Sequence, residues 1–289
     1  MFKNFLVLLR PYQYTKNLFI FAPLFFHFVY TKDIGWGYEL FDVLFPVFLS
    51  FVLFCFLASG VYIFNDLKDI EADRAHPKKK NRPLASGAIS KNTAIAIMLS
   101  FWSISFVGSW FITPFLLAVF VAYFLLNIAY SLGIKHVVIV DIFIIAIGFV
   151  LRLFAGASVG IELSHWIVIM TFLLALFLAI AKRRDDVLLA SQGLQTRKNI
   201  DGYNLEFVNA AMVFMSGAIL LAYILYTIET AMPKYLYLNS IFVIFGIVRY
   251  MQLTFVENAS GDPARVLLKD RKLQFCVLMW LVSFSVFMF

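Results

Sequence analysis

Nine long apolar runs, separated by short polar connections, are the feature that most constrains how this chain can fold. A membrane-spanning helix needs about 20 mostly apolar residues. Unbroken apolar runs without period-2 alternation indicate helices and not strands of a barrel. We therefore expect an all-α polytopic membrane protein with nine transmembrane helices. The runs cover residues 17–31, 40–64, 93–110, 114–130, 137–156, 166–181, 207–227, 235–256 and 273–289. The first and sixth runs are short, and we expect both to be helical over more residues than their apolar stretch.

The composition excludes the soluble classes of protein. Hydrophobic residues make up 62% of the chain and charged residues 14%, whereas charged residues are about 25% of an average globular domain. A soluble particle of this size has too little polar surface to cover so much hydrocarbon. A cytosolic enzyme, a secreted domain and a disordered chain are therefore excluded. Cys55 and Cys276 both lie inside apolar runs, so neither a disulfide framework nor a cysteine metal site is predicted.

Positive charge collects in alternate connections, as the positive-inside rule requires of cytoplasmic loops. If the N-terminus is cytoplasmic, the exceptions among 24 Lys and Arg residues are Lys32, Lys234 and Arg152. We expect a multi-pass protein of the plasma (inner) membrane, with its N-terminus inside and its C-terminus outside. The net charge of +7 then reflects orientation among membrane lipids, and no nucleic-acid partner is expected.

Three connections on the predicted inner side are long and polar, whereas the outer ones are short. They cover residues 65–92, 182–206 and 257–272. A membrane anchor needs no such asymmetry, so we expect a working face towards the cytoplasm. We expect one domain over residues 1–289, without a soluble appendage or linker.

An acidic ladder follows the second apolar run. Asp66, Asp69 and Asp73 are spaced i, i+3 and i+7, which places them on one face of a continuing helix. Asn65 lies one turn before Asp69. Oxygen ligands of this kind suit Mg²⁺, which typically binds one or two carboxylates together with substrate phosphates. The alternative is a solvated acidic turn. Arg82 follows after a run of lysines, and its guanidinium suits phosphate oxygens, although the same cations also serve as a topology signal.

Further cations and one acid lie near the ends of spans or inside them. Lys16 and Lys135 each stand near the end of a span, where a lysine is either an anchor that reaches the interface or a phosphate ligand. Asp141 and Arg152 lie within the fifth run, where ionisable groups are usually functional or paired. Eleven residues of helix separate these two by about 16 Å, so we expect no direct bond between them.

Several motifs together resemble the UbiA superfamily of intramembrane prenyltransferases. The first signature is Asn65-Asp-x-x-Asp69-x-x-x-Asp73 followed by Arg82-Pro-Leu-x-x-Gly87. The opening over 9–17 is also similar to that superfamily. The stretches 130–135, 148–156, 181–183 and 261–271 are similar to one branch, the decaprenyl-phosphate phosphoribosyltransferases.

The resemblance implies helices bundled around a polar cavity that faces the cytoplasm. It implies Mg²⁺-dependent transfer of a 5-phosphoribosyl group from phosphoribosyl diphosphate to a polyprenyl phosphate, with release of diphosphate. Four residues would hold the metal, the three aspartates among them would also act in catalysis, and six more residues would bind the substrates. The metal group is Asn65, Asp66, Asp69 and Asp73, and the substrate group, which also includes Asn65, is Lys16, Arg82, Lys135, Arg152, Lys182 and Arg183.

One departure bears on the choice of substrate. Aromatic prenyltransferases of this superfamily carry a second motif, Asp-x-x-x-Asp, after the sixth span. Here the stretch 182–189 has adjacent Asp185 and Asp186, then Leu189, and adjacent helical residues point about 100° apart. Cations replace that motif, which suits a donor with an additional phosphate. Two alternatives stay open: prenyl transfer from a polyprenyl diphosphate to an aromatic acceptor, and, less favoured, transport, which should place charge near the midplane of several spans.

Overall fold

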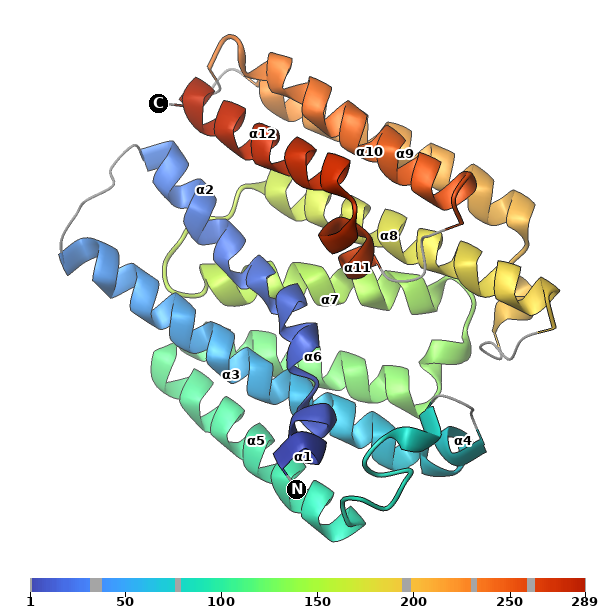
Figure 1. Ribbon diagram of the computed structural model, residues 1–289. Helices are drawn as coiled ribbons and strands as arrows, with labels where there is room; N and C mark the ends of the chain where they lie inside the picture. Colours follow the sequence, from blue (N-terminus) through green and yellow to red (C-terminus); the bar gives the residue numbers. More distant parts are fainter. Residues whose placement is uncertain are drawn as a thin grey trace. The chain divides into compact units, whose positions relative to one another are not determined.

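The computed structural model (Figure 1) describes residues 2–31, 38–75, 79–193, 199–229, 233–258 and 263–288. Within these ranges every regular element is a helix and no strand is present. The prediction of an all-α fold is therefore confirmed. Parts of two sequence motifs lie outside the described residues, namely Lys78 of the lysine run before Arg82 and the Gly261-Asp262 pair of the stretch 261–271.

The chain divides into two compact units. Unit 1 contains Met1–His27, Ile34–Gly133 and Leu151–Glu162, and unit 2 contains Phe28–Asp33, Ile134–Val150 and Leu163–Phe289. The expectation of a single domain over residues 1–289 stays a prediction, and each unit is described by itself.

Unit 1 is built around one long helix, α3 (Tyr38–Lys68), which packs along α5 (Lys91–Ile112) and also contacts α6 (Pro114–Leu132). Thr113 separates the last two: its side chain accepts a hydrogen bond from Leu116 N, and Pro114 occupies the first helical turn. The other elements are α1 (Phe2–Leu9), the 3₁₀ helix η1 (Pro11–Phe21), most of α2 (Ala22–Thr31), α4 (Ile70–Ala75), η2 (Lys79–Asn81) and the end of α7 (Val140–Ala157).

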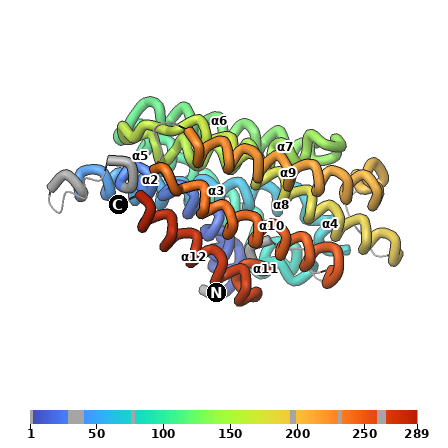
Figure 2. The backbone as a smooth tube through the Cα atoms, turned by 90° about the horizontal axis from the view of Figure 1, so that it is seen from above, coloured from blue at the N-terminus to red at the C-terminus, as the bar shows by residue number. Residues whose placement is uncertain are grey.

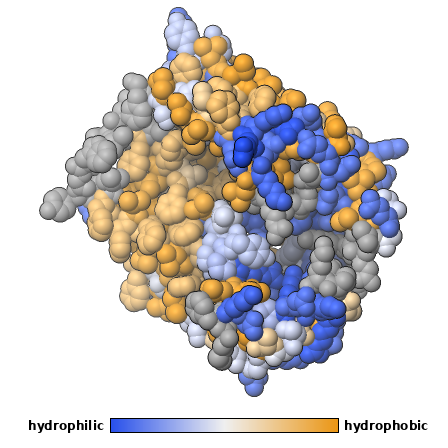
Figure 3. All heavy atoms as spheres, viewed as in Figure 1, coloured by the Kyte–Doolittle hydropathy of each residue, from blue (hydrophilic) through white to orange (hydrophobic). Residues whose placement is uncertain are grey.

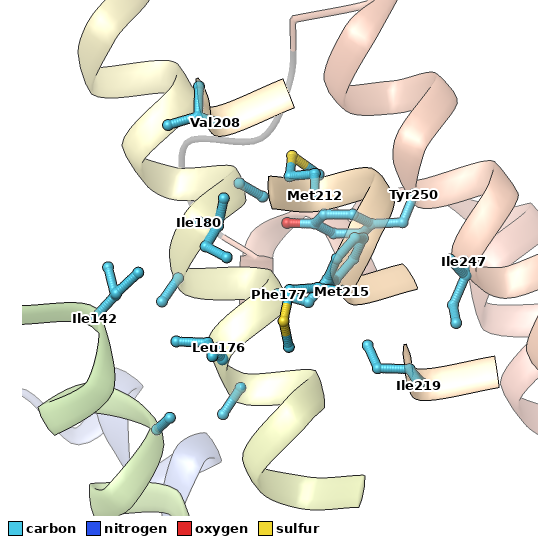
Figure 4. Packing of buried hydrophobic residues seen from close by; sticks show 14 of the residues in the cluster. Ile142, Leu176, Phe177, Ile180, Val208, Met212, Met215, Ile219, Ile247 and Tyr250 are labelled. Carbon is cyan, nitrogen blue, oxygen red and sulfur yellow. The ribbon is translucent and has the colours of Figure 1, made fainter. Parts of the chain in front are cut away.

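Unit 2 holds the start of α7 and the helices that follow it. Here α8 (His165–Ser191) packs against α9 (Leu205–Ile228), and α10 (Ser240–Phe255) lies beside α12 (Arg271–Met288), as Figure 2 shows. Short elements connect them: η3 (Ile134–His136), η4 (Ile200–Gly202), η5 (Leu236–Asn239) and α11 (Pro263–Lys269). Phe177, Met212 and Tyr250 come from three different helices and meet in the core of this unit (Figure 4).

Eight helices in the described part of the chain are long and apolar enough to span a membrane. Large hydrophobic side chains stay exposed on them, for example Phe111 and Trp110 on α5, and apolar residues cover much of the surface in Figure 3. The predicted run 17–31 instead forms the end of η1 followed by α2, a helix of 10 residues. Pro23 lies in the first turn of α2, where its missing N–H breaks no helical hydrogen bond. The count of nine spans therefore stays a prediction.

The sixth run lies in a helix longer than its apolar stretch, as expected. Residues 166–181 belong to α8, which continues to Ser191 over 27 residues. Lys182, Arg183 and Asp186 therefore all belong to the C-terminal part of a single helix. The sequence-based boundary at residue 181 marked the end of the apolar composition and not the end of the helix.

Candidate functional site

The acidic ladder lies where α3 gives way to α4. The first helix ends at Lys68, Asp69 forms a turn, and the second helix begins at Ile70. Two backbone hydrogen bonds keep the helical spacing across this break: Asp69 N donates to Asn65 O at 3.0 Å, and Asp73 N donates to Asp69 O at 2.8 Å. The predicted spacing along the ladder is thus largely retained, with one local interruption.

Two of the three carboxylates converge on one arginine. Asp66 and Asp73 are 2% and 3% exposed. The Nη1 atom of Arg82 donates to Asp66 Oδ1 at 3.0 Å and to Asp73 Oδ2 at 2.7 Å. Because one nitrogen reaches both oxygens, the two side chains point to a common position. Charge-assisted hydrogen bonds of this kind are about twice as strong as neutral ones, so the single positive charge of Arg82 stabilises two buried carboxylates at once.

A second arginine reaches the same carboxylate. Arg10 pairs with Asp66 Oδ1, and its guanidinium lies 5.3 Å from the centre of the Tyr62 ring. Arg10 separates α1 from η1 and has φ 55° and ψ 55°, a left-handed conformation that is unusual for a residue with a side chain. Such strain costs about 1–3 kcal/mol and often marks functional positions. Sequence reasoning placed Arg10 only among the inner charges, and its position before Pro11 in the opening motif was the available signal.

The remaining predicted residues of unit 1 lie in two settings. Asn65 and Asp69 are half-buried on the turn that carries Asp66, and Lys16 is half-buried on η1. Arg152 is 5% exposed. Its Nε donates to Asn17 Oδ1 at 2.9 Å, and its guanidinium carbon lies 5.0 Å from the centre of the Phe54 ring. Helix packing in unit 1 therefore accounts for the burial of this arginine, and its predicted role in substrate binding stays a prediction.

In unit 2, Arg183 and Asp141 form a fully buried ion pair. Both side chains are 0% exposed, and Arg183 Nε lies 2.9 Å from Asp141 Oδ2. The Nη1 atom of Arg183 also donates to Asp186 Oδ2 at 2.5 Å. Lys182 on α8 and Lys135 on η3 are half-buried. The structure shows that two acids orient the guanidinium of Arg183, and its predicted role as a phosphate ligand stays a prediction.

Two residues that sequence reasoning missed complete the surroundings of Asp141. Tyr203 OH donates to Asp141 Oδ1 at 2.7 Å, and Asn199 Nδ2 donates to Asp141 Oδ2 at 3.0 Å. Burial raises the pKa of the Tyr203 phenol above its usual value, and the hydrogen bond to Asp141 raises it further. Tyr203 therefore stays a neutral donor. The available signal was the ionisable Asp141 inside a span, which predicted a partner without identifying it.

The stretch 182–189 is fastened to its own unit by a third cation. Arg184 Nε donates to Asn209 Oδ1 at 2.9 Å, and its Nη1 donates to the backbone oxygen of Thr254 at 2.6 Å. These contacts join α8 to α9 and α10. Asp186 bonds to Arg183, and the adjacent Asp185 lies about 100° away from it around the helix.

The 269–271 motif has a structural role in unit 2. Arg249 Nη2 donates to Asp270 Oδ2 at 2.6 Å, and Asp270 Oδ1 accepts from Leu273 N at 2.8 Å at the start of α12. The hydrogen bond from Arg249 lowers the pKa of Asp270 below its usual value, and the hydrogen bond from Leu273 N contributes a smaller lowering. One carboxylate thus caps α12 and ties it to α10.

The acidic residues at the α3–α4 junction offer oxygen ligands of the kind that suit a divalent cation. In the described part of the chain, no set of three or more His, Cys, Asp or Glu side chains is arranged around a metal position. Asp66 and Asp73, however, offer oxygen donors that converge on a cationic nitrogen, and oxygen donors are the ligands that Mg²⁺ prefers. The guanidinium of Arg82 stands where a cation would be attracted. The predicted third carboxylate, Asp69, lies at the helix break between them.

Comparisons with known proteins agree on one family. Residues 34–276 match the family model of the UbiA prenyltransferase family. A decaprenyl-phosphate phosphoribosyltransferase of Mycolicibacterium smegmatis is 32% identical, over 94% of this chain and 88% of that protein. A protein of the same name from Mycobacterium tuberculosis is 31% identical, over 95% of this chain and 91% of that protein. Among solved structures, a UbiA homolog from Archaeoglobus fulgidus bound to GPP and Mg²⁺ has a TM-score of 0.69 at 21% identity, covering 99% of this chain and 98% of that one.

Proposed function

Because this chain belongs to the UbiA prenyltransferase family, we propose that it transfers a 5-phosphoribosyl group from phosphoribosyl diphosphate to a polyprenyl phosphate, with release of diphosphate. The observation that carries the choice of reaction is the similarity to decaprenyl-phosphate phosphoribosyltransferases over 94% of the chain. The convergence of Asp66 and Asp73 on Arg82 supports the location of the site.

The end of α3 is proposed to hold the metal and the diphosphate of the donor. Mg²⁺, when bound, would neutralise charge that develops on the leaving diphosphate. Arg82 and Arg10 already contact the carboxylates and are suited to bind phosphate oxygens in two-pronged fashion. The residues proposed for the metal are Asn65, Asp66, Asp69 and Asp73.

The remaining cations are proposed to bind the other phosphate groups. Lys135, Lys182 and Arg183 would hold phosphate oxygens of the donor, including its 5-phosphate. Lys16 would bind the phosphate of the lipid, and Arg152 would bind substrate within unit 1. The prenyl tail would lie among apolar helices, in keeping with a multi-pass integral membrane protein whose N-terminus and site face the cytoplasm.

The proposed reaction needs no general base. A polyprenyl phosphate is already an anion near neutral pH, so a phosphate oxygen can attack the anomeric carbon without loss of a proton. The bond between that carbon and the diphosphate oxygen breaks, and diphosphate leaves with the electron pair. Donation from the ring oxygen stabilises positive charge on the sugar in the transition state. Arg82 and Arg10 would stabilise the negative charge on the departing group.

Product analysis tests this proposal. Purified protein in detergent, with Mg²⁺, labelled phosphoribosyl diphosphate and a polyprenyl phosphate, should yield a labelled lipid that mass spectrometry identifies as polyprenyl phosphoribose 5-phosphate. Asp66→Ala and Asp73→Ala should each abolish the product while the protein stays inserted in the membrane. Asp42→Ala, at the other end of α3, is the matched control and should keep the activity. No labelled lipid, together with prenylation of an aromatic acid from a polyprenyl diphosphate, would replace this proposal with the aromatic prenyltransferase alternative.

A further inference from the structure

One tyrosine fastens the start of α7 to the segment before α9, both within unit 2. The phenol oxygen of Tyr203 accepts a hydrogen bond from the backbone N–H of Ile139 at 2.8 Å, and its hydroxyl donates to Asp141 Oδ1 at 2.7 Å. Tyr203 is 6% exposed and Asp141 0% exposed. Because the phenol uses its donor and an acceptor position at once, it fixes two residues of the same turn.

The turn that Tyr203 holds is strained. Ile139 has φ +69°, a left-handed conformation that a β-branched residue rarely adopts. Such conformations persist only where the surroundings over-determine them. A close approach from η4 supplies part of that support, since a Cβ on Gly202 would lie 2.3 Å from Val138 Cγ2. Contacts from the segment 199–203 therefore help to keep Ile139, just before α7, in an unfavourable backbone conformation.

The same network orients the buried arginine. Asp141 Oδ2 accepts a hydrogen bond from Asn199 and forms the ion pair with Arg183 Nε. The Nη2 atom of Arg183 is buried and has no hydrogen-bond partner among the described groups. Tyr203 and Asn199, both neutral donors, thus hold the Asp141 carboxylate beside Arg183. The Nη2 atom of Arg183 can still donate hydrogen bonds.

The two hydrogen bonds of Tyr203, to Ile139 and to Asp141, connect it to Lys135 and Arg183, which are proposed to bind the donor. Lys135 lies in η3, four residues before Ile139, and two backbone hydrogen bonds link these turns: Val137 N donates to Ile134 O, and Asp141 N donates to Val137 O. Arg183 is reached directly through the carboxylate of Asp141. Tyr203 is therefore connected to Lys135 through backbone hydrogen bonds and to Arg183 through the Asp141 ion pair.

We propose that Tyr203 and Asp141 are positioning residues, which hold Lys135 and Arg183 in the arrangement that receives phosphate groups of the donor. This inference rests on the proposed function. Tyr203 and Asp141 need not touch the substrate, and neither takes part in the chemical step. Their effect should therefore appear in the binding of the phosphorylated donor and not in that of the lipid.

Tyr203→Phe is the direct test, because it keeps the ring and removes both hydrogen bonds. Tyr223→Phe is a matched control: Tyr223 is also buried in unit 2, donates to Asn239 Oδ1 at 2.5 Å and accepts from Trp280 Nε1 at 2.8 Å. We expect Tyr203→Phe to raise the KM for phosphoribosyl diphosphate about tenfold, with kcat and the KM for polyprenyl phosphate changed less than about twofold. Tyr223→Phe should leave all three within about twofold. Equal effects of the two variants on the donor KM would overturn the proposal.

A second variant and a second measurement separate this inference from the proposed function. Asp141→Asn should raise the same KM, and the Tyr203→Phe/Asp141→Asn double variant should show less than the product of the two single effects, since both act on one network. Hydrogen exchange of the peptide 134–143 should become faster in Tyr203→Phe and stay unchanged in Tyr223→Phe. Unchanged exchange in Tyr203→Phe overturns the positioning role even if the wild type is active. A wild type that neither binds nor converts phosphoribosyl diphosphate overturns the proposed function first, and with it the link to the donor.

Discussion

Arg82 joins Asp66 to Asp73. Without Arg82, the buried Asp73 carboxylate should lower the stability of the fold instead of raising it. The Arg82 side chain is 27% exposed, whereas the side chains of Asp66 and Asp73 are 3% and 4% exposed. Breaking one partner of a buried ion pair costs about 3–5 kcal/mol, and hydrogen bonds to charged groups contribute about 1.5–3 kcal/mol each. The partial exposure of Arg82 and the remaining contact of Asp66 with Arg10 reduce this cost, so we expect Arg82→Ala to lower the free energy of unfolding by about 2–4 kcal/mol.

The decisive comparison is Asp73→Asn in the two backgrounds. In the wild type, this change weakens the bond to Arg82 and should cost about 1–2 kcal/mol. In Arg82→Ala, it removes a buried charge that has lost its guanidinium and should be neutral or stabilising. The coupling energy between the two positions should therefore be about 2 kcal/mol.

The assay is unfolding in detergent micelles, followed by tryptophan fluorescence in metal-free buffer. Arg74 and Glu71 supply a matched control cycle, because their ion pair joins exposed side chains at 3.0 Å and should couple by less than about 0.5 kcal/mol. The reasoning is refuted if Asp73→Asn costs the same in the presence and in the absence of Arg82.

Two further predictions concern packing and pH. Gly156→Ala should destabilise unit 1 by about 3 kcal/mol or more, because its Cβ would lie 1.9 Å from the backbone oxygen of Ile20. In the control Gly217→Ala, the new Cβ meets nothing within 4 Å, so this change should be neutral or stabilising by up to about 1 kcal/mol. Thermal unfolding of both variants checks this difference, and equal stabilities would contradict it. The lowered pKa of Asp270 means that its bond to Arg249 stabilises the fold above the ordinary pKa of about 4 and is lost as pH falls through the folded-state pKa. The difference in stability between wild type and Asp270→Asn should then be full at pH 7 and shrink towards pH 3, and a difference independent of pH would contradict the assignment.

The helices could be predicted from sequence because apolar composition determines where a chain can cross a bilayer. The run 114–130 lies within a helix whose start is fixed locally, by Thr113 and Pro114. The run 17–31 was less informative, since composition cannot distinguish the 3₁₀ geometry of η1 from an α-helix. The end of α8 was also hidden, because the charged residues 182–186 interrupt its apolar run while the helix continues to Ser191.

The candidate site could be predicted only where its parts are close in sequence. The spacing of Asp66 and Asp73 placed them on one helical face, and the family motif added Arg82. The contact of Asp66 with Arg10 crosses 56 positions, and that of Asp141 with Tyr203 crosses 62. Contacts over such separations depend on tertiary packing, which a single sequence does not reveal. An isolated acid within a span predicts a partner, but the partner itself emerges only from the fold.

The most direct test of the account is whether the end of α3 binds a divalent metal together with diphosphate. Electron paramagnetic resonance can count Mn²⁺, used in place of Mg²⁺, on the purified protein with and without added diphosphate. We predict that the wild type and Asp42→Asn bind Mn²⁺ when diphosphate is present, and that the Asp66→Asn/Asp73→Asn double variant does not. Equal Mn²⁺ binding by the folded double variant and the wild type would contradict the assignment of this site.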